Sequence, residues 1–308
     1  MTLNDVQNSS REEQHKPIHR RGKRLILRST SMLPALLTIG NGICGFTSIH
    51  FATKYAESNA WLGNVAVAAW LLFAAMVFDM LDGRVARMTR KASDFGAQLD
   101  SLCDTISFGV APAMLMLRVV VRALRGEAQA IAGLPSNIFL ERLIWCVAGI
   151  YVACTVLRLA RFNVETETEE SAHMVFKGLP SPAAAAAVGS LVLLFVHLSE
   201  PGGSWLTSGW AQGLLSPEWL MTITGIVLPV LTLAISLLMV SNFSYPHVIN
   251  QWIRGKKPFS YIVKAAIVLI AAVLEFHLTL ALVTSGFAVS GMLGAGLRKL
   301  DDYRKNRG

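Results

Sequence analysis

Long apolar runs recur along almost the whole chain, and they limit its fold more than any other feature of the sequence. About 20 consecutive apolar residues allow a helix to cross the hydrocarbon core of a bilayer, which is roughly 30 Å thick. The composition agrees, because 53% of the residues are hydrophobic and only 16% are charged, which is too apolar for an ordinary soluble domain. The sequence therefore predicts an all-α protein, a polytopic membrane helix bundle.

The apolar runs give the positions of the expected membrane spans. Six runs suit a single crossing each: Met32–Ala52, Leu62–Met80, Ser107–Val121, Ile138–Leu157, Pro182–Leu198 and Leu220–Val240. The third of them would begin near Gly96 if its first turns are polar. The last apolar stretch, Phe259 to Leu297, would measure roughly 58 Å as one straight helix at about 1.5 Å per residue. We therefore expect a tight hairpin near Glu275 and His277, two further spans, and eight spans in all.

Lysine and arginine residues cluster at both ends of the apolar region: Arg20, Arg21, Lys23, Arg24 and Arg28, then Arg298, Lys299, Arg304, Lys305 and Arg307. Such clusters mark the cytoplasmic side of a membrane protein. Both termini are therefore expected in the cytoplasm, which requires an even number of crossings. Arg118, Arg122 and Arg125 would then lie on the opposite side, against the same rule. The net charge of +8 is interpreted in the same way, as attraction to anionic headgroups and not to nucleic acid.

The chain is expected to divide into three parts. Residues 1–30 form a basic cytoplasmic or interfacial segment, residues 31–246 a transmembrane core, and residues 247–308 a two-span hairpin with a basic tail. The four cysteines lie in or beside apolar segments without paired spacing: Cys44, Cys103, Cys146 and Cys154. They are expected to be small buried hydrophobes, and neither a disulfide framework nor a zinc site.

A dense group of charged residues lies between the second and third predicted spans. Five residues at the helical spacing i, i+3, i+4, i+7 and i+8 share one helix face: Asp79, Asp82, Gly83, Ala86 and Arg87. Three more, at i, i+4 and i+8, share one face of the next helix: Gly96, Asp100 and Asp104. Ser93 or Asp94 is a suitable N-cap for that second helix. Two helices joined by a short cytoplasmic turn can therefore point four carboxylates at one another.

Four carboxylates at a membrane boundary require a partner. Each costs roughly 2.5–3.5 kcal/mol at the middle of a membrane helix, and less near the interface. Hard carboxylate oxygens suit Mg²⁺ or Mn²⁺, and two such ions close together can stabilise an attacking and a leaving oxygen around phosphorus. Gly83 and Ala86 would let a substrate approach the helix backbone, and Arg87 offers a cationic fork for phosphate. The group predicts a metal-dependent reaction of a phosphate compound.

Two alternative roles compete with this interpretation of the aspartates. A purely structural role is disfavoured, because ionisable residues in membrane helices are functional by default. A divalent-cation transporter is a sharper alternative, but transport sites tend to lie at the bilayer midplane on broken helices of an inverted repeat. These aspartates cluster at the cytoplasmic end of two consecutive spans without a second copy, which favours chemistry on a substrate shared between membrane and cytosol.

The spacing of these residues resembles the signature of the CDP-alcohol phosphatidyltransferases. It reads Asp79-x-x-Asp82-Gly83-x-x-Ala86-Arg87, then eight residues, then Gly96-x-x-x-Asp100-x-x-x-Asp104. Every fixed position is present, which is far more specific than a lone glycine motif. Further segments are similar to the membrane-spanning phosphatidylserine synthases: LPALLTIGNGICGF, AAMVFDMLDGRVAR, LDSLCDTISFGVAPA, RLARFNV, FKGLPSPAAAA and LMVSNFSYP. One departure is Pro34-Ala35, where the family often has Pro-Asn.

The resemblance implies a function and a set of site residues. It implies that the four aspartates bind two divalent ions, that Asp104 is the general base, and that four positions surround the CDP moiety: Gly83, Ala86, Arg87 and Ser93. The implied reaction joins CDP-diacylglycerol and L-serine to give phosphatidylserine and CMP. The implied assembly is a homodimer with a six-helix core in each protomer, to which the last two spans are an addition. The core motif leaves the acceptor open, because glycerol 3-phosphate or inositol would use the same CDP site.

A zwitterionic acceptor such as serine needs a cation for its carboxylate. Arg158 and Arg161 end the fourth predicted span at i and i+3 and so share a face. Lys177, in the segment FKGLPSP, could close over the same site. The alternative is that these are ordinary positive charges of cytoplasmic loops. Arg161 is the better candidate for the carboxylate contact, with Lys177 and Arg158 beside it.

Overall fold

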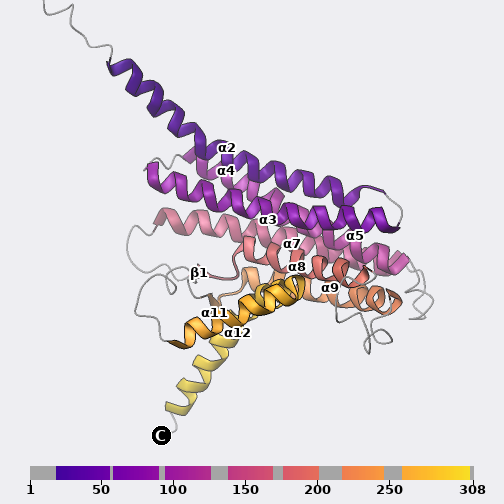
Figure 1. Ribbon diagram of the computed structural model, residues 1–308. Coiled ribbons are helices and arrows are strands. Elements are labelled where there is room, and N and C mark those ends of the chain that lie inside the picture. The colour runs from indigo at the N-terminus through magenta and orange to yellow at the C-terminus, as the bar shows by residue number, and fades with distance from the viewer. Residues whose placement is uncertain are drawn as a thin grey trace, which may run out of the picture.

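The computed structural model describes residues 19–55, 58–89, 94–125, 138–168, 176–200, 217–245 and 259–305, and almost all of them are helical. The helices in chain order are α2 (His19–Thr53), α3 (Ser58–Thr89), α4 (Asp94–Asp104), the π-helix η1 (Thr105–Val110), α5 (Ala111–Arg125), α7 (Ile138–Thr168), α8 (Ser181–Ser199), α9 (Pro217–Val240), α11 (Phe259–Leu274) and α12 (Phe276–Lys305). Two short strands, β1 (Phe176–Lys177) and β2 (Ser244–Tyr245), form an antiparallel pair. Figure 1 shows the long helices lying side by side in one bundle.

Seven helical segments of the described chain are long and apolar enough to cross a membrane: Leu33–Thr53, Ala60–Met88, Phe95–Leu124, Phe139–Val164, Ser181–Ser199, Trp219–Val240 and Phe276–Gly294. The first six correspond to the six predicted runs. The third begins at Phe95, near the early start expected at Gly96, because α4, η1 and α5 follow one another without a break. The prediction of an all-α polytopic membrane protein is confirmed.

Helix α8 is a central packing element, and it is built from small residues. Its sequence SPAAAAAVGS places Ala184, Ala185 and Ala187 in the core with no exposed surface. Small side chains let helix backbones approach closely, which matters in a bilayer because lipid tails are as apolar as the side chains themselves. Helix α8 accordingly packs against α3, α9 and α12.

The expected break in the last apolar stretch is present, but the two helices that it separates are unequal. Glu275 is the single non-helical residue between α11 and α12. Helix α11 has 16 residues, and its described part includes the apolar segment Ala265–Leu274. Helix α11 packs mainly on α12. Seven helices of spanning length lie in the described part of the chain, and the eighth crossing stays a prediction.

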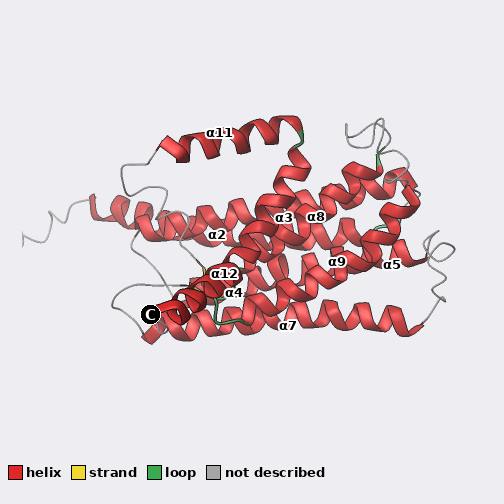
Figure 2. Cartoon of the chain, turned by 90° about the horizontal axis from the view of Figure 1, so that it is seen from below, coloured by secondary structure: helices red, strands yellow, loops and turns green. Residues whose placement is uncertain are grey.

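The hairpin of α11 and α12 returns the chain to the end of the bundle where α2 begins. Figures 1 and 2, which differ by a 90° turn, both place the start of α2 and the end of α12 toward the same end. Arg122 lies at the other end, where its guanidinium stands 5.3 Å from the ring centroid of Trp61, near the start of α3. That is the position expected from the sequence, and a cation over an indole face is a stabilising contact. Which end faces the cytoplasm stays a prediction.

Candidate metal centre and substrate site

The last turns of α3 present the first half of the charged motif. Helix α3 continues without interruption to Thr89, so Asp79, Asp82 and Gly83 keep the helical spacing that the sequence predicted. Among the described residues, a Cβ atom built on Gly83 has no neighbour within 4 Å, so the helix backbone is open on that side. The exposed Arg87 donates from Nε to the carbonyl oxygen of Gly83, at 3.0 Å. The open backbone and the cationic side chain therefore lie on the same side of the helix.

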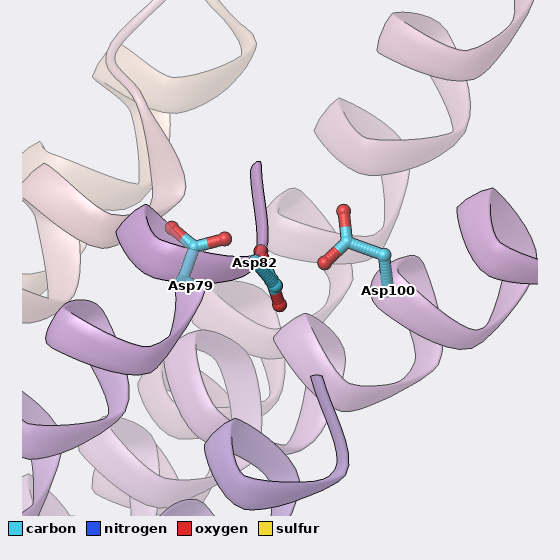
Figure 3. A group of neighbouring side chains, drawn as sticks. All are labelled: Asp79, Asp82 and Asp100. Atoms are coloured by element: carbon cyan, nitrogen blue, oxygen red, sulfur yellow. The ribbon is translucent and has the colours of Figure 1, made fainter. Parts of the chain in front are cut away.

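Helix α4 brings Asp100 to the two aspartates of α3. One carboxylate oxygen from each of Asp79, Asp82 and Asp100 lies within 4.8 Å of the other two, and Figure 3 shows the three carboxyl groups gathered between the two helices. Asp82 is 5% exposed, and the other two are half-buried. The prediction that the two helices turn carboxylates toward one another is confirmed for these three residues.

Two carboxylate oxygens of this group lack a partner within the described part of the protein. Asp82 Oδ2 and Asp100 Oδ1 are buried and have no hydrogen-bond partner in the described part of the chain. A buried carboxylate oxygen without a partner is costly, and the mutual repulsion of three carboxylates adds to that cost. A cation removes both costs, and an all-oxygen donor set suits a hard divalent ion. The residues present therefore fit a divalent metal site.

Asp104 lies one turn further along α4 and outside the group of three. It is 7% exposed, and its Oδ1 accepts a hydrogen bond of 2.8 Å from Nδ2 of Asn41. It follows Asp100 by four residues in the same helix, α4. The structure thus places the predicted fourth aspartate beside the cluster, fixed in orientation by a neighbouring helix. Its role as a fourth ligand remains a prediction.

Asn41 is a site residue that the sequence analysis did not single out. It lies in α2 without exposed surface, and its carbonyl oxygen accepts a hydrogen bond of 2.9 Å from Ser107 Oγ. Gly45 permits this close approach, because a Cβ atom there would stand 2.6 Å from Cα of Ser107. An asparagine between glycines in a membrane span was the available signal. Such a residue is costly in lipid and therefore tends to face a partner.

The two arginines of α7 lie on the other side of the site. Arg158 donates from Nη1 to Ser181 Oγ at 2.8 Å, and its buried Nε has no hydrogen-bond partner in the described chain. Arg161 donates from Nη1 to Asn242 Oδ1 at 3.1 Å. The two guanidinium groups thus have different neighbours, and which of them binds the acceptor carboxylate stays a prediction.

Two other predicted contacts are described only in part. Ser93 lies outside the described residues. Lys177 belongs to strand β1, where only its backbone is described, and it pairs with Ser244 of β2. Ala86 lies on the helix face of Gly83 and is half-buried. The CDP contacts and the lysine contact thus stay predictions.

Comparison with known proteins gives a family and named relatives. The family model described as CDP-alcohol phosphatidyltransferase matches residues 31–215. The chain is 34% identical over 198 residues to the CDP-diacylglycerol–serine O-phosphatidyltransferase of Mycobacterium tuberculosis, covering 63% of this chain and 58% of that relative. It is 32% identical over 215 residues to the Bacillus subtilis protein of the same name, covering 70% and 90%. The archaetidylserine synthase of Methanothermobacter thermautotrophicus is 34% identical over 218 residues, covering 70% of each chain.

The extent of these matches differs between relatives. The chain spans 58% of the length of the mycobacterial relative, and the same share of a Helicobacter pylori relative. The family match includes all four aspartates and Asn41, and it ends before α9 begins at Pro217. Helices α9, α11 and α12 therefore lie outside the matched residues.

Proposed function

We propose that this chain, which belongs to the CDP-alcohol phosphatidyltransferase family, transfers the phosphatidyl group of CDP-diacylglycerol to L-serine, giving phosphatidylserine and CMP. One observation carries the proposal: three carboxylates converge at the junction of two membrane helices, with oxygens of Asp82 and Asp100 left unpaired and a buried Asp104 beside them. The names of the reported relatives all refer to serine. Their names favour serine over glycerol 3-phosphate or inositol as the acceptor.

The aspartates would hold two divalent ions, Mg²⁺ or Mn²⁺. The proposed ligands are Asp79, Asp82, Asp100 and Asp104. When bound, the ions would offset negative charge on the diphosphate and on the departing phosphate. Arg87 adds a fixed positive charge on the same face of α3, and the open backbone at Gly83 gives the CDP moiety room to approach. Ala86 and Ser93 complete the proposed CDP contacts.

The chain's own residues would then handle the acceptor. The serine hydroxyl oxygen forms a bond to the phosphorus that carries the diacylglycerol. The bond from that phosphorus to the bridging oxygen of the diphosphate breaks, and CMP leaves. Asp104 takes the hydroxyl proton as general base. Asn41 binds Oδ1 of Asp104 and so fixes the orientation of the carboxylate that takes this proton.

The acceptor carboxylate would be held by cations from α7 and β1. Arg158 is half-buried and lies within electrostatic range of Asp79 and Asp104, so a carboxylate bound there would keep the serine hydroxyl close to the proposed base. Arg161 and Lys177 are the further candidates. A guanidinium binds a carboxylate through paired N–H groups, which fixes orientation as well as charge.

The proposal includes an orientation and an assembly. The protein is integral to the membrane. We place it in the cytoplasmic membrane with the aspartates and both termini facing the cytoplasm, because basic residues flank the apolar region at both ends. We further propose a homodimer, each protomer contributing a six-helix core. A reporter fused after Gly308 should be active only on the cytoplasmic side, and a C-terminal tag exposed outside would refute this orientation.

Purified protein in detergent micelles tests the function directly. CDP-diacylglycerol is supplied with serine, glycerol 3-phosphate or inositol in turn, and CMP and the lipid product are measured. Phosphatidylserine with one equivalent of CMP is expected from serine alone. Product from another acceptor, with serine ignored, would refute the acceptor but keep the reaction type. Absence of CMP release with every acceptor would refute the transferase reaction, and the cation transporter would then be favoured. Micelles have no barrier across which ions could be transported, so the assay reports the chemical reaction alone.

A further inference from the structure

Strand β1 lies just before α8 and strand β2 just after α9, and the two strands pair with each other. We call this pair, together with residues 178–180 and 241–243, the clamp. Phe176 pairs with Tyr245 across the two strands. The backbone N–H of Gly178 donates to the carbonyl of Phe243 at 2.8 Å, and that of Leu179 donates to the carbonyl of Leu238 at 3.0 Å. Gly178 has φ +85° and lies so close to the Met239 carbonyl that a Cβ atom would collide with it, so this turn requires glycine.

The clamp borders both arginines of the proposed acceptor site. Ser181, directly after the clamp at the start of α8, accepts the 2.8 Å hydrogen bond from Arg158. Asn242, within the clamp, accepts the 3.1 Å hydrogen bond from Arg161. A shift of the clamp would therefore move the hydrogen-bond partners of both guanidinium groups. Two strands of two residues each are too short to hold a position alone, so the clamp depends on what packs against it.

Helix α12 supplies that support through Tyr245. The hydroxyl of Tyr245, a 3% exposed residue, donates to the carbonyl oxygen of Ala288 at 2.8 Å. Its ring lies directly over Gly291, where a Cβ atom would stand 2.5 Å from the ring carbon Cζ. Burial raises the pKa of Tyr245 to about 12, which keeps the phenol protonated and able to donate. Helix α12 is itself joined to α8 by the 2.6 Å hydrogen bond between Ser190 and Thr284.

We propose that Tyr245 is a positioning residue, through which α12 holds the clamp and so sets Arg158 and Arg161 for the acceptor. This role rests on the proposed function, because it assigns the arginines to the acceptor carboxylate. It gives α12, which lies outside the residues matched by the family model, a part in substrate binding. The CDP-diacylglycerol contacts on α3 do not depend on the clamp.

The test uses two glycines of α12 that differ in one respect. Gly291 faces the Tyr245 ring, whereas a Cβ atom on Gly286 meets none of the described residues within 4 Å. Alanine is intrinsically better than glycine in a helix, so a loss in Gly291→Ala reports the collision with the ring. Gly291→Ala should raise KM for serine about tenfold, the lower end of what a hydrogen bond to a charged group contributes. KM for CDP-diacylglycerol should stay within about twofold, and Gly286→Ala should match the unmodified protein.

A second variant decides between positioning and mere packing. Tyr245→Phe keeps the ring and loses only the hydroxyl, so it should raise KM for serine by a smaller factor. If Gly291→Ala fails to fold, Tyr245→Phe still allows KM for serine to be compared with KM for CDP-diacylglycerol.

The outcomes separate this role from the proposed function. Equal increases in both KM values, or a lower Tm with unchanged KM values, would overturn the positioning role of Tyr245. Unmodified protein that transfers to glycerol 3-phosphate or inositol instead of serine would count against the proposed acceptor alone. The same ratio of KM values is then measured with the acceptor that is used.

Discussion

Two regions of this protein bury carboxylates to a similar degree and treat them in opposite ways. At the junction of α3 and α4, Asp82 is 5% exposed and its Oδ2 has no hydrogen-bond partner among the described residues. At the junction of α11 and α12, Glu275 is 8% exposed, but its Oε2 lies 3.2 Å from Nε2 of His197. The His197 ring in turn stacks on that of His277, with 4.4 Å between centroids.

The difference shows that burial alone does not distinguish a carboxylate that binds a ligand from one that serves the packing. A buried carboxylate that the protein pairs is part of the packing, and here it joins the C-terminal hairpin to α8. A buried carboxylate that the protein leaves unpaired is available to a ligand, because the missing partner must come from elsewhere. On this criterion we expect the aspartate cluster to bind a ligand and Glu275 to serve the packing.

The largest effect is expected from removal of divalent cations. Excess EDTA should reduce CMP release to background, because the aspartates would then repel one another and the diphosphate. Added Mg²⁺ or Mn²⁺ should restore turnover. CMP release from CDP-diacylglycerol in detergent measures both steps. Full turnover in excess chelator would refute the metal assignment. It would also refute the inference that the unpaired oxygens of Asp82 and Asp100 bind a metal ion.

The next largest effect is expected from Asp104→Asn. A neutral amide cannot accept the serine proton, so kcat should fall by about 10²–10⁴-fold, the usual contribution of a general base. The residue volume is almost unchanged, so thermal unfolding in detergent should show a folded protein. Glu275→Gln is the matched control, since it also replaces one buried carboxylate by an amide. A fully active Asp104→Asn variant would refute the base assignment.

A smaller effect is expected from replacing the arginines of α7. Like the two carboxylates, they differ in whether the protein supplies a hydrogen-bond partner. Arg158 has a buried Nε without a described partner, and Arg161 binds Asn242. Replacing either by alanine should raise KM for serine more than KM for CDP-diacylglycerol. A loss of about 1.5–3 kcal/mol is expected for a hydrogen bond to a charged group, with the greater loss for Arg158. Serine KM values that do not change in either variant would place the carboxylate elsewhere.

The smallest effect on turnover is expected from Glu275→Gln. The change removes a charge-assisted interaction with His197 and should lower the free energy of unfolding by about 1–3 kcal/mol. Turnover of the folded protein should stay within about twofold, which chemical unfolding and CMP release in the same detergent can compare. A folded Glu275→Gln variant without activity would show that a paired carboxylate also serves the reaction.

The sequence predicted the parts of the fold and site that depend on local spacing. Asp79, Asp82 and Gly83 fall on one face of α3 because the helix simply continues through them. The contact of Asn41 with Asp104 could not be read in the same way, since it depends on how closely α2 approaches η1 at Gly45.

The hydrogen-bond partners of the two arginines depend on tertiary structure. Arg158 and Arg161 are three residues apart on α7 and look equivalent in sequence. Their neighbours differ, because one guanidinium meets Ser181 at the start of α8 and the other meets Asn242 after α9. These neighbours lie 23 and 81 positions further along the chain, and no local pattern reveals them.

The π-helix η1 sets the rotational phase between the two halves of the third span. Each residue turns an α-helix by about 100°, so the wider winding of a π segment changes which face the following residues present. Before η1, Asp100 and Asp104 face the aspartates of α3 and Asn41. After it, Leu115, Met116 and Val119 are buried in the apolar core. One continuous rod can thus direct acidic groups toward a substrate and apolar groups toward the bundle without a hinge.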